Sequence, residues 1–351
     1  MLAVCKSRAI PTLAASIVLI VGTTRGDEPL TETPAAPAPA SAVTTPTRAD
    51  DARIILTAGQ QGSAEATERP EVKSVREGTS SRRARLDAID ELGLHRLPRP
   101  NQQLVQGVVD QVSLFRRLPS FRCEVDPRVH DYFIHHPDVA VSIWRAMGIS
   151  ELQLKRTGEW SYSMDTNDGT SGTISVLYRS RESCLMLCDG MFKSPFLQAP
   201  IAARSVMHLR TQFSTDHAQR TFATHHADMF VSFPSQKIET VAKLISPLSN
   251  VIVDRNFQEI SLFLHVMWLA MGRQPGWIEQ VAGQLEGVSE PQRTELIKLT
   301  ARVYVETQTA ERRRAGETVT LDAIRPPTAP AATQPVSTIR QAADSPGPGA
   351  Q

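Results

Sequence analysis

Two short stretches of the chain combine adjacent histidines with an aspartate, a pattern that could bind a metal ion. They are His135-His136-Pro137-Asp138 and His225-His226-Ala227-Asp228. Neutral imidazole is the commonest metal ligand, and a hydrolase could use it together with a carboxylate. Neighbouring residues of a strand point to opposite faces, however, so each doublet offers at most one ligand to a given site.

No stronger metal or catalytic signature accompanies these stretches. The sequence has no H-E-x-x-H motif, cysteine quartet or G-x-S-x-G motif. The glycines at 169 and 172 belong to a hairpin loop and not to a phosphate-binding loop, because no helix follows them. We therefore predict no cofactor, metal ligand or catalytic residue, with His226 and Asp228 as an ordinary surface pair. A hydrolase that uses the His/Asp groups stays as a third hypothesis.

The balance of charge in the composition argues against nucleic acid as a partner. The 351 residues include 38 basic and 37 acidic residues, which give a formal net charge of +1. Such a chain has no overall positive field to attract nucleic acid. The local basic run at Arg82, Arg83 and Arg85 is interpreted as a solvated segment.

The N-terminus has the features of an export signal. Lys6 and Arg8 precede the apolar stretch 10–21, and the small residues Thr24 and Gly26 precede a cleavage point before Asp27. We predict a signal peptide over residues 1–26 and export to the periplasm or the extracellular space. If the signal is not cleaved, it is also the only membrane contact that we predict.

The rest of the chain divides by composition into one domain with two flanks. Residues 27–100 are rich first in Pro, Ala and Thr and then in polar residues and Arg, which predicts disorder for most of the stretch and leaves room for one brief helix at 84–92. The same holds for 307–351, so the predicted folded domain is 101–306. Its three cysteines, at 123, 184 and 188, are an odd number, which favours small buried side chains over a disulfide framework.

The folded domain begins with helical patterns and continues with alternating ones. Apolar residues at helical spacing predict helices over 101–118, 127–135 and 137–148, with a short strand at 121–125 between the first two. Period-two alternation then predicts strands at 151–164, 173–179, 184–192, 206–213 and 220–233. Short connections without helices make these an antiparallel meander of about five to six strands.

The chain returns to helical patterns after the meander. Helices are predicted at 238–248, 254–272, 277–285 and 291–305, the last with Ser289 and Gln292 as a capping box. The helix 254–272 is apolar nearly all round, so it should be buried, with Asp254 as its N-cap and Gly272 just beyond its end. Truncation of Trp268 to Ala should therefore be strongly destabilising. The predicted fold class is α+β: the meander packs on this long apolar C-terminal helix, with additional helices.

This order of elements resembles the helix-grip arrangement of the START and polyketide-cyclase-like superfamily. The resemblance covers residues 120–271 and rests on the strand 121–125, the segment HHPDVAVSIWRAMG and the segment SLFLHVMWLAM. The succession G-E-W-S-Y, G-T-I-S-V-L-Y-R and L-C-D-G also resembles the strands of periplasmic lipoprotein carriers of the LolA and LolB kind. Both resemblances imply an apolar ligand between sheet and helix.

Three hypotheses about function follow. The first is an exported, non-enzymatic binder of a lipid or other apolar small molecule, and the second is an exported, envelope-associated interaction protein with a solid core. The third is the hydrolase described above. In the first hypothesis His225 orients a polar head group. The predicted cavity lining is Leu154, Trp160, Tyr162, Met207, Leu209, His225, Met229, Leu264 and Trp268.

Overall fold

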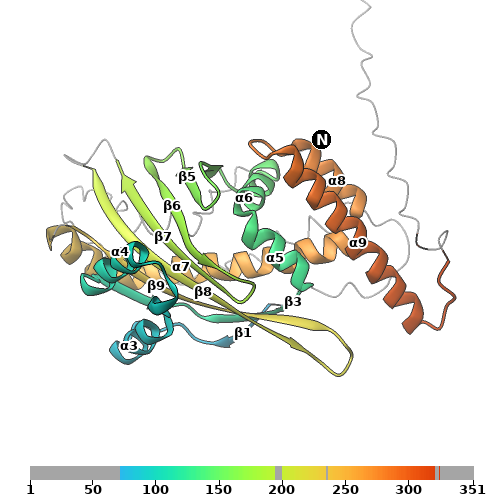
Figure 1. The fold of residues 1–351 in the computed structure, drawn as a ribbon, viewed down its shortest axis with the longest axis horizontal. Helices are drawn as coiled ribbons and strands as arrows, with labels where there is room; N and C mark the ends of the chain where they lie inside the picture. Colours follow the sequence, from blue (N-terminus) through green and yellow to red (C-terminus); the bar gives the residue numbers. More distant parts are fainter. Residues whose placement is uncertain (1–71, 194–199, 235, 321–323, 325–351) are drawn as a thin grey trace, which may run out of the picture.

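The structure is a computed structural model that describes residues 72–193, 200–234, 236–320 and 324, with backbone alone over 236–249. It confirms the α+β class, because one large antiparallel sheet packs against helices (Figure 1). The predicted signal peptide, the stretch 27–71 and most of the predicted C-terminal tail lie outside the described residues. Among the described helices, none has both the length and the apolar character that crossing a bilayer requires.

Nine strands form the sheet, against the five to six expected from the sequence. The order is β1-β3-β9-β8-β7-β6-β5-β4, and β2 also pairs with β9, next to β3. All pairs are antiparallel. The strands are β1 (Val72–Arg76), β2 (Leu114–Arg117), β3 (Ser120–Glu124), β4 (Gln153–Arg156), β5 (Ser161–Asp165), β6 (Thr170–Arg179), β7 (Ser183–Phe192), β8 (Ile201–Thr215) and β9 (Thr221–Ser232).

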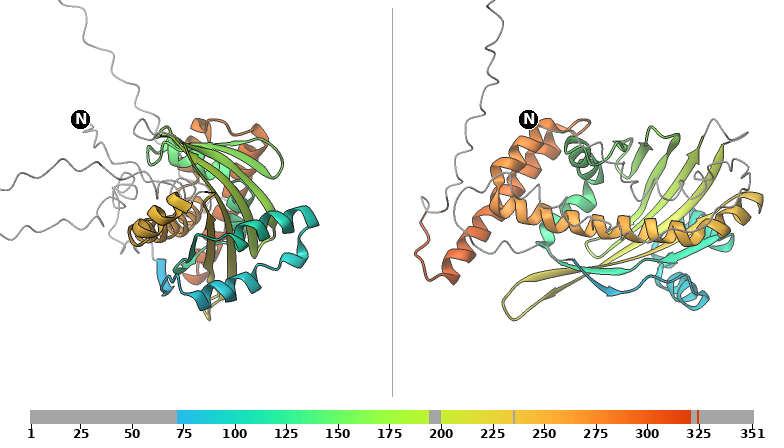
Figure 2. Two further views of the ribbon diagram at one scale, coloured as in Figure 1. Left: turned by 90° about the vertical axis from the view of Figure 1, so that its left-hand side faces the viewer. Right: turned by 180° about the vertical axis from the view of Figure 1, so that it is seen from behind.

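Helices cover both faces of the sheet (Figure 2). The long α7 lies along one face, α3 and α4 pack on the opposite face, and α8 and α9 gather at the C-terminal end of α7. The helices are α3 (Arg82–Glu91), α4 (Arg99–Asp110), α5 (Pro127–His135), α6 (Pro137–Ala146), α7 (Gln236–Arg273), α8 (Pro275–Gln284) and α9 (Glu290–Arg314), with a short 3-10 helix, η1 (Leu94–Arg96).

The folded unit begins at β1 and not at residue 101. β1 pairs with β3 along the sheet edge, and α3 starts at Ser81, whose side chain accepts a hydrogen bond from the Ala84 amide at 3.2 Å. The brief helix expected at 84–92 corresponds to α3, whereas the composition gave no indication of β1. β1 exposes most of its side chains and depends on backbone pairing, and α3 buries only the small Ala84 and Ala88. The predicted disorder of 72–100 is therefore wrong.

Two predicted elements are each divided in the structure. The helix expected over 101–118 ends at Asp110, and its last part is strand β2, in which Phe115 and Arg117 are buried. The strand expected over 151–164 is the hairpin β4–β5, closed where the Thr157 amide donates to the Ser161 carbonyl at 2.9 Å. In both cases the apolar spacing fits the observed structure as well as the predicted one.

The helices expected at 238–248 and 254–272 are one continuous helix, α7. Asp254 is not an N-cap but lies inside α7, where it accepts a hydrogen bond from Arg116 Nε at 3.0 Å. Gly272 is also helical, and a Cβ atom there would lie 3.0 Å from the Thr307 hydroxyl oxygen of α9. Both residues therefore serve tertiary contacts, which local sequence patterns do not reveal.

The predictions that depend on neighbouring residues alone are confirmed. Asp126 caps α5 and is followed by Pro127 at the first helical position, and Asn167 and Gly169 form the predicted turn with positive φ. The capping box of Ser289 and Gln292 is present. However, α9 continues to Arg314, so the predicted tail begins later than residue 307. Three arginines in its last turn favour this extension, since cations stabilise a helix C-terminus.

Candidate binding site on the inner face of the sheet

The inner face is defined here as the side of the sheet against which α7 packs. Odd-numbered residues of β9 from Ala223 to Val231 point to this side, and Phe257 of α7 packs among those from Ala227 on. Residues that are paired across neighbouring strands point to the same side of the sheet, so the inner face can be followed from β9 to the other strands. In one such row, Ala227 pairs with Leu209, Leu209 with Cys184 and Cys184 with Arg179.

The structure distributes the predicted lining residues over several apolar clusters. Leu154, Tyr162 and Leu209 share one cluster, and Leu209 also packs against a second one, which contains Met207, Met229 and Phe257. Leu264 and Trp268 belong to a third region. Trp160 is 38% exposed. Leu264 and Trp268 lie further along the long helix α7 than Phe257 does. Residues 257 and 268 of such a helix lie about 16 Å apart along its axis.

The region that best combines apolar and charged groups surrounds Tyr162. We call it the Tyr162 cluster. Its centre is three buried residues from adjacent strands. Half-buried apolar side chains from β4, β6, β7, β8 and α5 surround them, so this part of the inner face keeps apolar surface that is not fully covered. The members are Tyr162, Val176 and Cys184, with Ile134, Leu154, Ile174, Met186 and Leu209 around them.

Two arginines border the Tyr162 cluster. The guanidinium carbon of Arg156 lies 5.2 Å from the centroid of the Tyr162 ring, and that of Arg179 lies 4.6 Å from the Trp160 ring. Two nitrogens of Arg179, Nε and Nη1, are buried without a hydrogen-bond partner among the described residues, and the buried Tyr162 hydroxyl lies next to this arginine. Buried polar groups in proteins are almost always hydrogen-bonded. Unpaired donors at the edge of apolar surface are therefore a binding-site feature.

Burial raises the pKa of Tyr162, although the positive charge of Arg156 acts in the opposite direction. The hydroxyl consequently stays protonated at neutral pH and can donate a hydrogen bond. Together with Arg179 it offers hydrogen-bond donors to whatever lies beside it, whereas the buried carboxylate of Asp138, which also acts on Tyr162, is already paired with Arg156. Such a set of groups favours an acidic oxygen over a cation.

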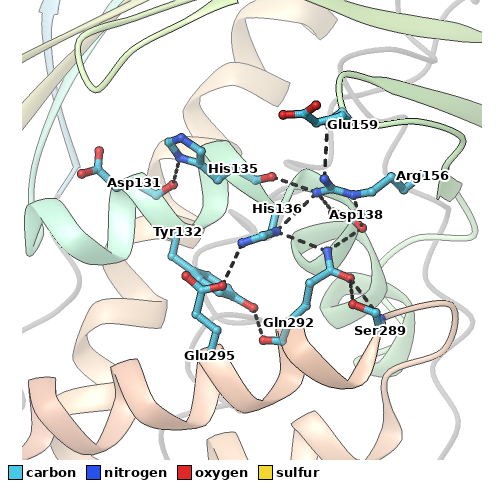
Figure 3. A network of polar contacts seen from close by, with 10 residues as sticks. All are labelled: Asp131, Tyr132, His135, His136, Asp138, Arg156, Glu159, Ser289, Gln292 and Glu295. Carbon is cyan, nitrogen blue, oxygen red and sulfur yellow. Dashed lines mark hydrogen bonds and ion pairs between the residues drawn. The ribbon is translucent and has the colours of Figure 1, made fainter.

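A polar network fixes Arg156 in place (Figure 3). Asp138, which is 3% exposed, accepts from Arg156 Nη2 at 3.3 Å and from Gln292 Nε2 at 2.8 Å. The aspartate lies in the first turn of α6, where the helix dipole favours a negative charge. Arg156 also donates to the backbone carbonyl of His135 at 3.0 Å. The arginine is therefore held against the Tyr162 ring by three elements.

The same network joins α9 to the pair α5 and α6 (Figure 3). The Tyr132 hydroxyl donates to the carbonyl of Gln292 at 2.8 Å. His136 accepts from Gln292 Nε2 at 3.2 Å through Nδ1, and its Nε2 lies 3.2 Å from a carboxylate oxygen of Glu295. Burial is the main cause that lowers the pKa of His136. The first histidine–aspartate stretch is thus part of a structural network that orients Arg156.

The second stretch divides between the two faces, as strand geometry predicts. His226 is on the outer face, and its Nδ1 lies 2.7 Å from the Ser120 hydroxyl. Asp228 is fully buried there, hydrogen-bonded to Arg117 Nε and Arg210 Nη2, both at 2.6 Å. The expected surface pair of His226 and Asp228 is therefore wrong, because β2 and α3 cover this aspartate. The described residues contain no group of three potential metal ligands.

A second histidine, which is not among the predicted site residues, lies beside His225. On the inner face the ring of His225 stacks on that of His130 from α5, with the centroids 5.5 Å apart. His225 Nδ1 lies 3.0 Å from the Ser261 hydroxyl of α7, and His130 Nε2 lies 3.1 Å from the Thr211 hydroxyl. The helical spacing of His130 and Phe133, which are three residues apart, indicates that both lie on the buried face of α5.

Comparisons with known proteins give no family for this chain. No family model matches it, and no curated protein does. Two solved structures are similar in part. A conserved protein from Geobacillus kaustophilus shares 16% identity over 40% of this chain and 93% of its own, with a TM-score of 0.25. DynU16, a putative protein in the dynemicin biosynthetic locus, shares 19% identity over 41% of this chain and 48% of its own, with a TM-score of 0.22.

Proposed function

We propose that the protein is an exported, non-enzymatic binder of an amphiphile that has an apolar body and an acidic head group. The observation that carries the proposal is the position of Arg179. Two of its nitrogens are buried without a partner among the described residues, beside the Tyr162 hydroxyl and at the border of the Tyr162 cluster. A carboxylate between them would satisfy these donors, and charge-assisted hydrogen bonds of this kind are strong.

The apolar part of the ligand would lie along the half-buried side chains of the Tyr162 cluster. Each methylene group removed from water contributes about 0.8 kcal/mol, so a chain of ten carbons offers ample driving force. His225 was expected to orient the head group, but it is enclosed by His130, Ser261 and Thr211. In the proposal Arg179 and Tyr162 take that role.

Three serine–histidine contacts could suggest hydrolysis instead. The Ser183 hydroxyl lies 2.9 Å from His208 Nε2, and similar pairs join Ser120 to His226 and Ser261 to His225. In none of them does a carboxylate of the described residues form a hydrogen bond to the second imidazole nitrogen, as a catalytic triad requires. Burial also lowers the pKa of His208 to about 4, which makes it a weak base. These features favour binding over hydrolysis.

The test is a titration with a fluorescent fatty-acid probe, followed by displacement with palmitate and with the alcohol of the same chain length. We expect saturable binding in which Arg179→Gln weakens palmitate at least tenfold and the alcohol little. Arg204→Gln is the matched control, since Arg204 is an exposed arginine of the same sheet, paired with Asp189. Absence of saturable binding would contradict the proposal and favour the interaction-protein hypothesis. Equal affinities of wild type and Arg179→Gln would contradict the role of Arg179.

A further inference from the structure

A hollow of about 730 Å³ lies well away from the Tyr162 cluster, between the C-terminal end of α7, α9, β3 and the β8–β9 hairpin. We call it the α7–α9 cleft. Figure 2 shows α9 beside the end of α7 on this side of the molecule. Sites for small molecules occupy about 300–1,000 Å³, so the cleft has a suitable size. The predicted lining residue Trp268 lies here and not on the inner face of the sheet.

Charged residues of both signs line the cleft in equal number, five basic and five acidic. Several of the acidic ones are already neutralised by neighbours. Arg128, which is outside the cleft, donates to Asp126 Oδ1 at 3.0 Å and to Glu306 Oε1 at 2.9 Å. Asp216 accepts from Arg220 Nε at 2.8 Å. The carboxylates therefore offer little free negative charge to a ligand.

Three of the basic residues, unlike these carboxylates, have no ion-pair partner among the described residues. Arg122 of β3, Arg273 of α7 and Arg314 of α9 line the cleft, and none forms an ion pair with a carboxylate of the described residues. Arg314 donates only to the Ala218 carbonyl, at 3.3 Å. Guanidinium groups that converge from three elements suit a phosphate or carboxylate group.

Aromatic rings complete the cleft. The guanidinium carbon of Arg122 lies 4.1 Å from the centroid of the Phe222 ring, which holds the charge in position. The half-buried Trp268 is fixed by its contact with His265, whose Nδ1 donates to the Glu124 carbonyl at 2.6 Å. A flat ring could therefore stack in the cleft while its acidic group meets the arginines.

We propose that the α7–α9 cleft is a second binding site, for a small organic anion that carries a planar ring and a phosphate or carboxylate group. The proposal is independent of the amphiphile site, because none of the Tyr162 cluster lines the cleft. The two sites also differ in ligand chemistry. The first site suits a long apolar chain, and the second suits a compact ring with concentrated negative charge.

Calorimetric titration of the full chain tests this at low ionic strength, with ATP, pyrophosphate and adenosine as probes in the absence of divalent ions. We expect saturable binding of ATP, weaker binding of pyrophosphate and no measurable binding of adenosine. Arg122→Gln and Arg273→Gln should each weaken ATP about tenfold, and added salt should weaken it further. Palmitate should not compete with ATP.

Arg255→Gln is the matched control, because Arg255 is an exposed arginine of the same helix, lies outside the cleft and pairs with Glu259 at 2.9 Å. Thermal melts establish that each variant is folded. The proposal is overturned if neither ATP nor pyrophosphate binds saturably, if adenosine binds as tightly as ATP, or if the control loses as much affinity as the cleft variants.

Discussion

The rings of His130 and His225 stack in the core at an interplanar angle of 20°, and both side chains are almost completely buried. The groups that face them are the hydroxyls of Thr211 of β8 and Ser261 of α7 and the ring of Phe213, and a carboxylate oxygen of Asp131 lies 3.7 Å from His130 Nδ1. No carboxylate of the described residues forms a hydrogen bond to either ring. Protonation of His225 is therefore unfavourable while the protein is folded.

Acid should destabilise the protein through His225. Burial, with a contribution from His130, lowers the pKa of His225 to about 3 from an ordinary value near 6.5. Below pH 6.5 the unfolded state binds a proton that the folded state does not. Stability is therefore greatest above pH 6.5 and falls as the pH decreases toward 3, by up to about 1.4 kcal/mol per pH unit for one histidine.

Urea unfolding at pH 7.0, 5.5 and 4.5 checks this expectation. His225→Gln should flatten the dependence of the free energy of unfolding on pH, since glutamine does not titrate. His217→Gln, at an exposed site in the β8–β9 turn, should leave the slope unchanged. Identical slopes for wild type and His225→Gln would show that His225 is not responsible.

Replacement of Asp138 should weaken the contact between α9 and the rest of the protein. Asp138→Ala removes the acceptor of Arg156 Nη2 and the nearer of the two acceptors of Gln292 Nε2, which keeps its contact with His136. Hydrogen bonds to charged groups contribute about 1.5–3 kcal/mol each, so a loss of at least about 2 kcal/mol is expected in chemical unfolding. Asp189→Ala breaks only the exposed pair with Arg204 and should cost less than about 1 kcal/mol. Similar losses for the two variants would disprove the structural role of Asp138.

Phe257 should contribute more to stability than Trp268. Phe257 is buried on α7 against Phe121, at 5.9 Å between ring centroids, whereas Trp268 is half-buried at the cleft. Truncation of a buried phenylalanine to alanine costs about 3–5 kcal/mol. We expect Phe257→Ala to fall in that range and Trp268→Ala below it, in paired thermal melts. A larger loss for Trp268→Ala would place its ring deeper than the structure does.

The cysteines of the folded domain should be unreactive until the protein unfolds. Burial raises the pKa of Cys123, Cys184 and Cys188 to about 12, and all three are free thiols. The thiolate is the reactive form, so a disulfide reagent should modify these residues slowly at pH 8. Addition of denaturant should expose three further thiols per chain. Rapid modification of any of the three in native buffer would show that the inner face opens readily.

The sequence determined the features that depend on near neighbours. Asp126 with Pro127 starts α5, Ser289 with Gln292 starts α9, and the turn at 167–169 joins two strands, because each needs only residues a few positions apart. The alternation from β5 to β9 likewise established an antiparallel sheet and the α+β class. These features depend on the local spacing of apolar residues and on capping residues, so a single sequence is enough to predict them.

Only the tertiary structure decided which distant residues meet. Asp254 resembled a helix cap until Arg116, 138 residues earlier in the chain, was found beside it. Asp228 resembled a surface residue until Arg117, 111 residues away, was found to pair with it in the core. The cavity lining was divided in the same way, because the path of α7 across the sheet separates Phe257 from Trp268. Such pairings depend on how whole elements pack, and no short stretch of sequence encodes that arrangement.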